Sequence, residues 1–129
     1  MIPVKAFTEE VSSPIDASTG LPTGKRQHMP VKIVKSLDSA SPALFAATVE
    51  NETLTNVTCN FYRERGDGGK PTAYFRVILT NARIVDLKNF GDGAIDGGER
   101  ESISMSFQMI TLEDLLSNTV ATDDWTVQF

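Results

Sequence analysis

The chain has 129 residues with 12 basic and 17 acidic side chains, which gives a net charge of −5. This length predicts one domain whose core needs neither a metal nor disulfide staples, and the single Cys59 can form no disulfide within the chain. The acidic balance argues against general nucleic-acid binding, and the lack of an apolar run near the roughly 20 residues of a membrane helix argues against membrane insertion.

The N-terminal part predicts a strand followed by a long loop. Residues 1–11 alternate, and Pro3 would lie near the start of the strand or at a sheet edge, where its missing N–H is harmless. The same residues contain no charged segment followed by an apolar core, so no signal peptide is visible and we expect cytoplasmic synthesis. Residues 12–28 are rich in proline and glycine and nearly without periodicity, which indicates either a functional projection or a floppy surface excursion.

A strand and an abrupt short helix come next. Residues 29–37 predict a strand with Met29, Val31 and Ile33 on one face and Lys32 and Ser36 on the other.

The helix is expected from Pro42 to about Glu50, with Ser41 as N-cap and Asn51 as a left-handed C-terminal stop. Its apolar stripe, which we expect to pack in the core, is Leu44, Phe45, Thr48 and Val49.

The second half of the chain predicts antiparallel strands. Residues 55–65 and 72–80 indicate a hairpin around the turn at 66–71, and Asn81-Ala82 is expected to bend the chain before a strand over 83–90. Residues 91–99 form a predicted loop rich in glycine and aspartate.

Residues 100–110 give the cleanest strand pattern. Thr111 with Asp114 is compatible with one helical turn, and residues 125–129 predict a final short strand. Six or seven strands with one short helix predict a mainly β fold, an antiparallel two-sheet β-barrel or sandwich with one short flanking α-helix.

Catalytic, metal and cofactor motifs are not supported. Residues 20–25 are one residue short of a phosphate-binding loop, and the acidic residues of the 91–99 loop lack the spacing of a calcium site. His28 is the only histidine, and we interpret it as an interface or strand-entrance residue instead of a catalytic base. Cys59 lies on an apolar strand face and is expected to be buried and inert. We therefore expect no enzyme activity and no cofactor.

Two predicted strand faces are polar but uncharged, which is unusual for a solvent-exposed face of a monomer. Hydroxyl and amide groups bond water or a passing backbone without the desolvation cost of fixed charges, so such a face suits a wet lumen wall or a subunit contact. Chance polar filling of a solvent face is the alternative. The possible lumen face is Ser102, Ser104, Ser106 and Gln108, and the second face is Asn56, Thr58, Asn60 and Tyr62.

Several motifs in order resemble the haemolysin-coregulated protein (Hcp) family, the tube proteins of type VI secretion systems. They are GKRQH at 24–28 leading into a strand and a Ser41-Pro42 helix start, NETLT at 51–55 with NFYR at 60–63, AYFRVILTNARI at 73–84, and DDW at 123–125.

The resemblance implies a single tube domain over residues 1–129 that forms a homo-hexameric ring. The rings would stack head-to-tail, contact sheath and spike proteins, be exported, and hold effector proteins in the lumen. The family carries a further strand ahead of the position at which this chain begins, so we expect that N-terminal strand to be missing.

The resemblance also implies the ring-stacking and interface residues, which are Thr23, Gly24, Lys25, Arg26, Gln27, His28, Asp123, Asp124 and Trp125. Lys25 and Arg26 on a projecting loop would supply the positive half of a head-to-tail contact, and Glu9, Glu10, Asp123 and Asp124 are candidates for the negative half.

A second hypothesis is a monomeric ligand-binding β-sandwich with a site built from residues 12–28 and 91–99. A small hydrolase is a weaker third, because no usable triad or carboxylate pair is present. The mass of the particle in solution separates a ring from a monomer.

Overall fold

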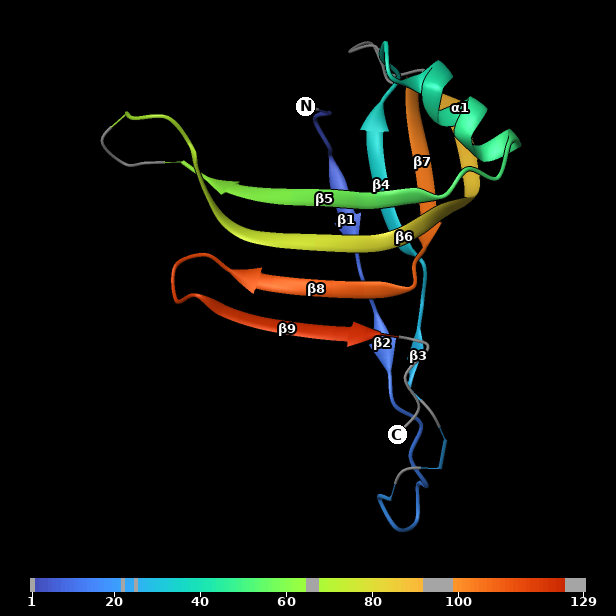
Figure 1. Cartoon of the computed structure of the whole chain (residues 1–129), viewed down its shortest axis with the longest axis vertical. Helices are drawn as coiled ribbons and strands as arrows, with labels where there is room; N and C mark the ends of the chain where they lie inside the picture. Colours follow the sequence, from blue (N-terminus) through green and yellow to red (C-terminus); the bar gives the residue numbers. More distant parts are fainter. Residues whose placement is uncertain (1, 22, 25, 65–67, 92–98, 125–129) are drawn as a thin grey trace. The chain divides into compact units, whose positions relative to one another are not determined.

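The mainly β, antiparallel fold class with one short helix is confirmed. The computed structural model describes residues 2–21, 23–24, 26–64, 68–91 and 99–124 (Figure 1). Its elements are β1 (Ala6–Thr8), β2 (Val11–Ser12), β3 (Gln27–His28), β4 (Val31–Ser36), α1 (Ser41–Val49), β5 (Leu54–Arg63), β6 (Thr72–Gly91), β7 (Glu99–Ser106), β8 (Met109–Asp114) and β9 (Thr119–Asp124).

The chain forms two compact units. Unit 1 comprises Met1–Glu52 and Ile84–Ser106, and unit 2 comprises Thr53–Arg83 and Phe107–Phe129. In unit 1 the strand order is β1-β4-β7-β6, and in unit 2 β5 and β8 flank β6 while β9 pairs with β8. The long strand β6 therefore belongs to both units.

The core face of unit 1 carries two charged residues among apolar ones. β4 and β7 pair antiparallel, with Val31 opposite Met105 and Ile33 opposite Ile103. The next pair on the same face is Lys35 opposite Glu101, and both of these side chains are fully buried. Alternation along a strand sends every second residue to one face, so Lys35 and Glu101 occupy positions where apolar side chains are expected.

Unit 2 has one apolar and one polar face. On the apolar face, Val57 of β5 lies opposite Leu79 of β6, which in turn lies opposite Ile110 of β8. Leu79 and Ile110 are buried, as is the neighbouring Val77. The residues between them in sequence point to the other face, which is described below.

The side-chain phase of two strands shifts at the same place. Buried positions in β6 change from the odd residues Val77 and Leu79 to the even residues Ala82 and Ile84 across Asn81, whose φ is 52°. This positive φ corresponds to the bend predicted at Asn81-Ala82. The Asn81 amide donates a 2.8 Å hydrogen bond to the side-chain oxygen of Gln108. The buried residues also change from odd to even numbers at Gln108, from Phe107 to Ile110.

The predicted single strand over 100–110 is therefore wrong. The chain passes from unit 1 to unit 2 at 106–107, and the shift in phase ends β7 at Ser106 and starts β8 at Met109.

The segment after it also differs from the prediction. Thr111 and Asp114 lie in β8 and pair with β6 and β9, so no helical turn forms there. The cross-strand partners on both sides override the weak local capping signal. The last described strand is β9, and the strand predicted over 125–129 lies outside the described residues.

The N-terminal segment is two strands, not one. Glu9 and Glu10 separate β1 from β2, because β1 pairs with β4 whereas β2 pairs with β3. The predicted loop over 12–28 is likewise more ordered than expected, since its two ends form the β2–β3 ladder with Val11 opposite His28. We call residues 11–28 the arm (Figure 1).

The helix α1 differs from the prediction at its start and on its buried face. Its N-cap is Ala40, without a side-chain cap, whereas the left-handed stop at Asn51 is confirmed by a φ of 53°. The predicted stripe is wrong at two positions, since Phe45 is 58% exposed and Val49 is 66% exposed. Ala47 is the buried residue, with Leu44 and Thr48 half-buried beside it, because i, i+3 and i+4 share a helix face.

Candidate assembly surfaces

The arm carries the residues expected to stack rings. Gln27 pairs with Ser12, and His28 is only 9% exposed. Thr23 donates a 3.0 Å backbone hydrogen bond to the carbonyl of Pro14, so the two sides of the arm stay paired beyond the strands. Gly24 is exposed, Arg26 is half-buried, and Lys25 lies outside the described residues.

A structured turn forms the tip of the arm. The N–H of Asp16 donates to the carbonyl of Leu21, and the N–H of Gly20 donates to the carbonyl of Asp16, both at 2.7 Å. The Asp16 carboxylate accepts 2.7 Å bonds from the hydroxyl and N–H of Ser18, which lower the pKa of Asp16. Ile15 and Leu21 are exposed beside this turn.

Arg26 does not lie at this tip. Arg26 directly precedes the β3 residue that pairs with β2, which places it near the base of the arm.

The acidic candidates fall at two separate places. Glu10 lies at the base of the same arm, where its carbonyl accepts a 3.0 Å bond from the N–H of Met29. Asp123 and Asp124 end β9 in unit 2, opposite Ile110 and Met109. Trp125 lies outside the described residues.

The serine ladder of β7 is mostly covered. Ser102 is 5% exposed and lies opposite Val34, Ser104 is half-buried opposite Lys32, and Ser106 is exposed at the strand end. Gln108 follows β7 in the turn and bonds Asn81. Of the four residues expected to form one polar face, Ser106 and Gln108 are the exposed members.

A broader polar face lies on the sheet of unit 2. Its rows run across the four strands, and we call it the threonine–asparagine face. One row is Asn56, Thr80, Met109 and Asp124; the next is Thr58, Ile78, Thr111 and Thr122; the third is Asn60, Arg76, Glu113 and Val120. Its β5 members Asn56, Thr58 and Asn60 were singled out by the sequence pattern, whereas Tyr62 follows a register shift after Phe61.

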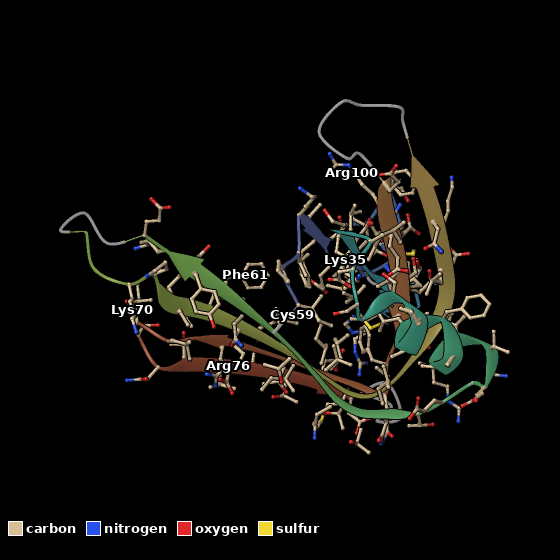
Figure 2. The ribbon with its side chains drawn as sticks, turned by 90° about the horizontal axis from the view of Figure 1, so that it is seen from above. Lys35, Cys59, Phe61, Lys70, Arg76 and Arg100 are labelled. Atoms are coloured by element: carbon tan, nitrogen blue, oxygen red, sulfur yellow. The ribbon has the colours of Figure 1, made fainter. Side chains whose placement is uncertain are left out.

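The charges on this face compensate one another. Arg76, which Figure 2 labels, lies in the third row. It donates from Nε to Oδ1 of Asn60 at 3.1 Å and contacts Oε2 of Glu113 at 3.2 Å, so the charges of the guanidinium and the carboxylate balance within one row. The hydroxyls of Thr111 and Thr122 share a 3.3 Å hydrogen bond in the next row. The remaining side chains are mostly hydroxyls and amides, with Ile78, Met109 and Val120 among them and the carboxylate of Asp124 at the β9 edge.

Lys35 is the centre of a buried charged cluster that the sequence pattern did not predict. The Lys35 ammonium lies 3.1 Å from Oε1 of Glu101 and 2.9 Å from Oδ1 of Asp38, and it donates to the hydroxyl of Ser41 at 3.2 Å. Burial alone would lower the pKa of Lys35, but the hydrogen bonds and charges of Asp38 and Glu101 outweigh it and raise that pKa. The sequence does place Lys35 and Glu101 at strand positions where the alternation calls for apolar residues, and this pattern could have indicated the cluster.

Cys59 is half-buried, which is less than the burial predicted for it. Burial raises the pKa of its thiol, which keeps the sulfur protonated and a poor nucleophile. Within the described ranges no three His, Cys, Asp or Glu side chains gather as a metal site would require. In the same part of the chain, no helix has the length and apolar character needed to cross a lipid bilayer.

Comparison with known proteins decides the family. The model of the family described as "Type VI secretion system effector, Hcp" matches residues 1–113. The chain belongs to the Hcp family. The mainly β architecture and the motifs around the arm and β6 agree with this membership.

Individual Hcp-related proteins resemble the chain over nearly its whole length. The major exported protein of Pseudomonas aeruginosa PAO1 is 37% identical over 127 residues, which is 95% of this chain and 73% of that protein. A crystal structure of an Hcp protein gives a TM-score of 0.90 at 29% identity, covering 96% of this chain and 77% of the other. Secreted protein Hcp3 of P. aeruginosa gives 0.76 at 32% identity, covering 96% and 75%.

Membership in the Hcp family makes this a type VI secretion protein of the tube-forming and secreted kind. The family is structural and secreted, and it is associated with the type VI apparatus. The name of the Pseudomonas relative supports export in this family.

Proposed function

We propose that residues 1–129 act as one tube domain that forms a hexameric ring, stacks head-to-tail into the inner tube of the type VI apparatus, and carries effectors in its lumen. It acts by assembly and export and converts no substrate. Sheath and spike proteins are its further partners. The observation that carries the proposal is the threonine–asparagine face in a chain of this family, since that face is broad, polar and internally charge-compensated.

The threonine–asparagine face is the proposed lumen wall. A wall of hydroxyls and amides stays wetted and offers hydrogen bonds, yet it imposes no strong single-sign field on a passing protein. It is preferred over the serine ladder because Asn56, Thr58 and Asn60 are exposed, whereas Ser102 is buried.

The arm is the proposed stacking element. A head-to-tail contact joins one ring face to the opposite face of the next ring, and such a heterologous interface grows a filament. The arm supplies exposed Ile15 and Leu21 for apolar contact and Lys25 and Arg26 for charge, with Asp123 and Asp124 as acidic partners in the neighbouring ring.

Charge reversal tests the stacking role. Lys25→Glu with Arg26→Glu places acidic side chains opposite an acidic surface, so we expect rings to form but tubes to shorten or disappear, with a larger defect at low salt. Light scattering gives the particle mass, which is about six times the 14.1 kDa chain for one ring, and electron microscopy gives tube length.

A matched control reverses two lysines outside the arm, Lys88→Glu with Lys70→Glu, and should leave tube length unchanged. Tubes of normal length from the arm variant at matched concentration would exclude the basic pair from stacking. A wild-type protein that stays monomeric at high concentration would contradict the tube itself.

A further inference from the structure

The helix α1 has little apolar packing to hold it in place. Its buried residue is Ala47, while Phe45 and Val49 face outward and are more than half exposed. A nine-residue segment is too short to be stable as an isolated helix. Since its N-cap residue is Ala40, a capping side chain does not stabilise its first turn either. Something else must fix the start of this helix.

The connection into α1 is built around one ammonium group. Lys35 donates to the carbonyl of Ser36 at 3.1 Å, to Oδ1 of Asp38 at 2.9 Å and to the hydroxyl of Ser41 at 3.2 Å. Asp38 Oδ1 also accepts from the N–H of Ala40 at 3.0 Å, and the Ser41 hydroxyl accepts from the N–H of Asp38 at 3.1 Å. The side chains that meet Lys35 are thus the ones that shape the first turn of α1.

The same ammonium is tied to the sheet. Lys35 lies 3.1 Å from Oε1 of Glu101 on β7, and both side chains are 0% exposed. Figure 2 labels Lys35. A buried charge that loses its partners is strongly unfavourable, so breaking the contact of Lys35 with Asp38 or Glu101 costs considerable free energy. Neither carboxylate oxygen of Glu101 has a well-aligned hydrogen bond to a described residue, which leaves Lys35 as its described counter-charge.

We propose that Lys35 is a latch that holds α1 against the β4–β7 sheet. When the latch opens, α1 detaches cooperatively while the β4–β7 sheet stays folded. Its accessible point is Asp38, whose side chain is 34% exposed, whereas Lys35 and Glu101 are sealed. Opening the latch would free α1, whose outward surface is uncharged and carries Phe45 and Val49. This inference stands independently of the proposed tube.

Hydrogen exchange of the whole chain tests the latch. Lys35→Met with Glu101→Leu removes both buried charges together, so the sheet keeps a packed apolar pair while Asp38 and Ser41 lose their donor. We expect amides of residues 41–52 to exchange about tenfold faster than in the wild type, with β4 and β7 protection retained. Lys32→Met is the matched control, because Lys32 is an exposed lysine of the same strand.

Asp38→Asn is a second test variant, and it keeps both buried charges. It should accelerate exchange in residues 41–52 selectively, by less than the double variant. Exchange there within about twofold of the Lys32→Met control would overturn the latch. Equal acceleration of α1, β4 and β7 would also overturn it, since Lys35 would then support the unit as a whole. If the double variant does not fold, Asp38→Asn decides alone.

Discussion

At the scale of single residues, aspartates shape several turns of this chain. Asp16 accepts bonds from Ser18 at the arm tip, and Asp38 accepts bonds from Lys35 and Ala40 before α1. Asp114 accepts the N–H groups of Leu116 at 2.9 Å and Ser117 at 3.3 Å in the β8–β9 turn. These hydrogen bonds lower each carboxyl pKa, because they favour the charged form.

The β8–β9 turn therefore contributes an acid-labile part of the stability. A carboxyl pKa lowered in the folded state gives stability that is present above the unfolded value of 3.8 and lost as the pH falls through the folded value. We expect Asp114→Asn to be less stable than the wild type at pH 6, and the two to converge as the pH falls well below 3.8. Urea midpoints at several pH values measure this.

Asp86→Asn is the control variant, since it removes one exposed carboxylate of β6 that lies outside this turn. A difference between Asp114→Asn and wild type that stays constant down to the lowest pH would mean that the carboxylate charge does not stabilise the turn.

At the scale of elements, Asn81 is the point in β6 at which the buried side of the strand changes between its unit 2 part and its unit 1 part. Its positive φ shifts the phase of the strand by one residue, so that Leu79 and Ala82 both reach buried positions. Asparagine tolerates this conformation, and its amide also bonds Gln108 where the neighbouring strand shifts phase.

Asn81→Ala should lower the free energy of unfolding by about 1–2 kcal/mol, because alanine pays the full cost of a left-handed backbone. Asn81→Gly should lose less, since glycine adopts this φ readily. Gln108→Ala isolates the side-chain bond and should cost about 0.5–1 kcal/mol, as an exposed hydrogen bond does. Denaturant unfolding measures all three. Equal stability of Asn81→Ala and Asn81→Gly would show that backbone conformation at this position carries no energetic weight.

Alternation predicted the hairpin of β5 and β6 because one apolar and one polar face repeat along both strands. It could not give the end of β7, since Phe107 keeps the apolar phase and the break depends on the partner strands. It also passed over the pairing of Lys35 with Glu101, because these two charges lie 66 positions apart in the chain. In the local sequence, a charged residue that is buried by such long-range pairing looks the same as an exposed one.

At the scale of the whole molecule, residue chemistry alone did not identify the proposed lumen wall. The serines of β7 and the Thr and Asn residues of β5 look alike in sequence, as uncharged polar positions alternating with apolar ones. What separates them is burial, because Ser102 is covered whereas Thr58 is exposed. The motifs around Arg26 pointed to the family, but the pairing of the arm, which places Arg26 near its base, needed the structure.

Cargo retention distinguishes the two polar faces. Thr58→Lys with Thr122→Lys puts two positive charges in the central row of the threonine–asparagine face, where both positions are exposed. If this face lines the lumen, rings should keep their mass, because exposed substitutions typically change stability by only about 0.5 kcal/mol. The set of effector proteins that co-purify with the rings should change, since a row without charged side chains has gained a positive field. Ser104→Lys with Ser106→Lys is the matched pair on β7, and quantitative mass spectrometry of the purified rings compares the two. A change in cargo confined to the serine pair would assign the lumen wall to β7 instead. Unchanged cargo in both variants would show that neither polar face binds cargo.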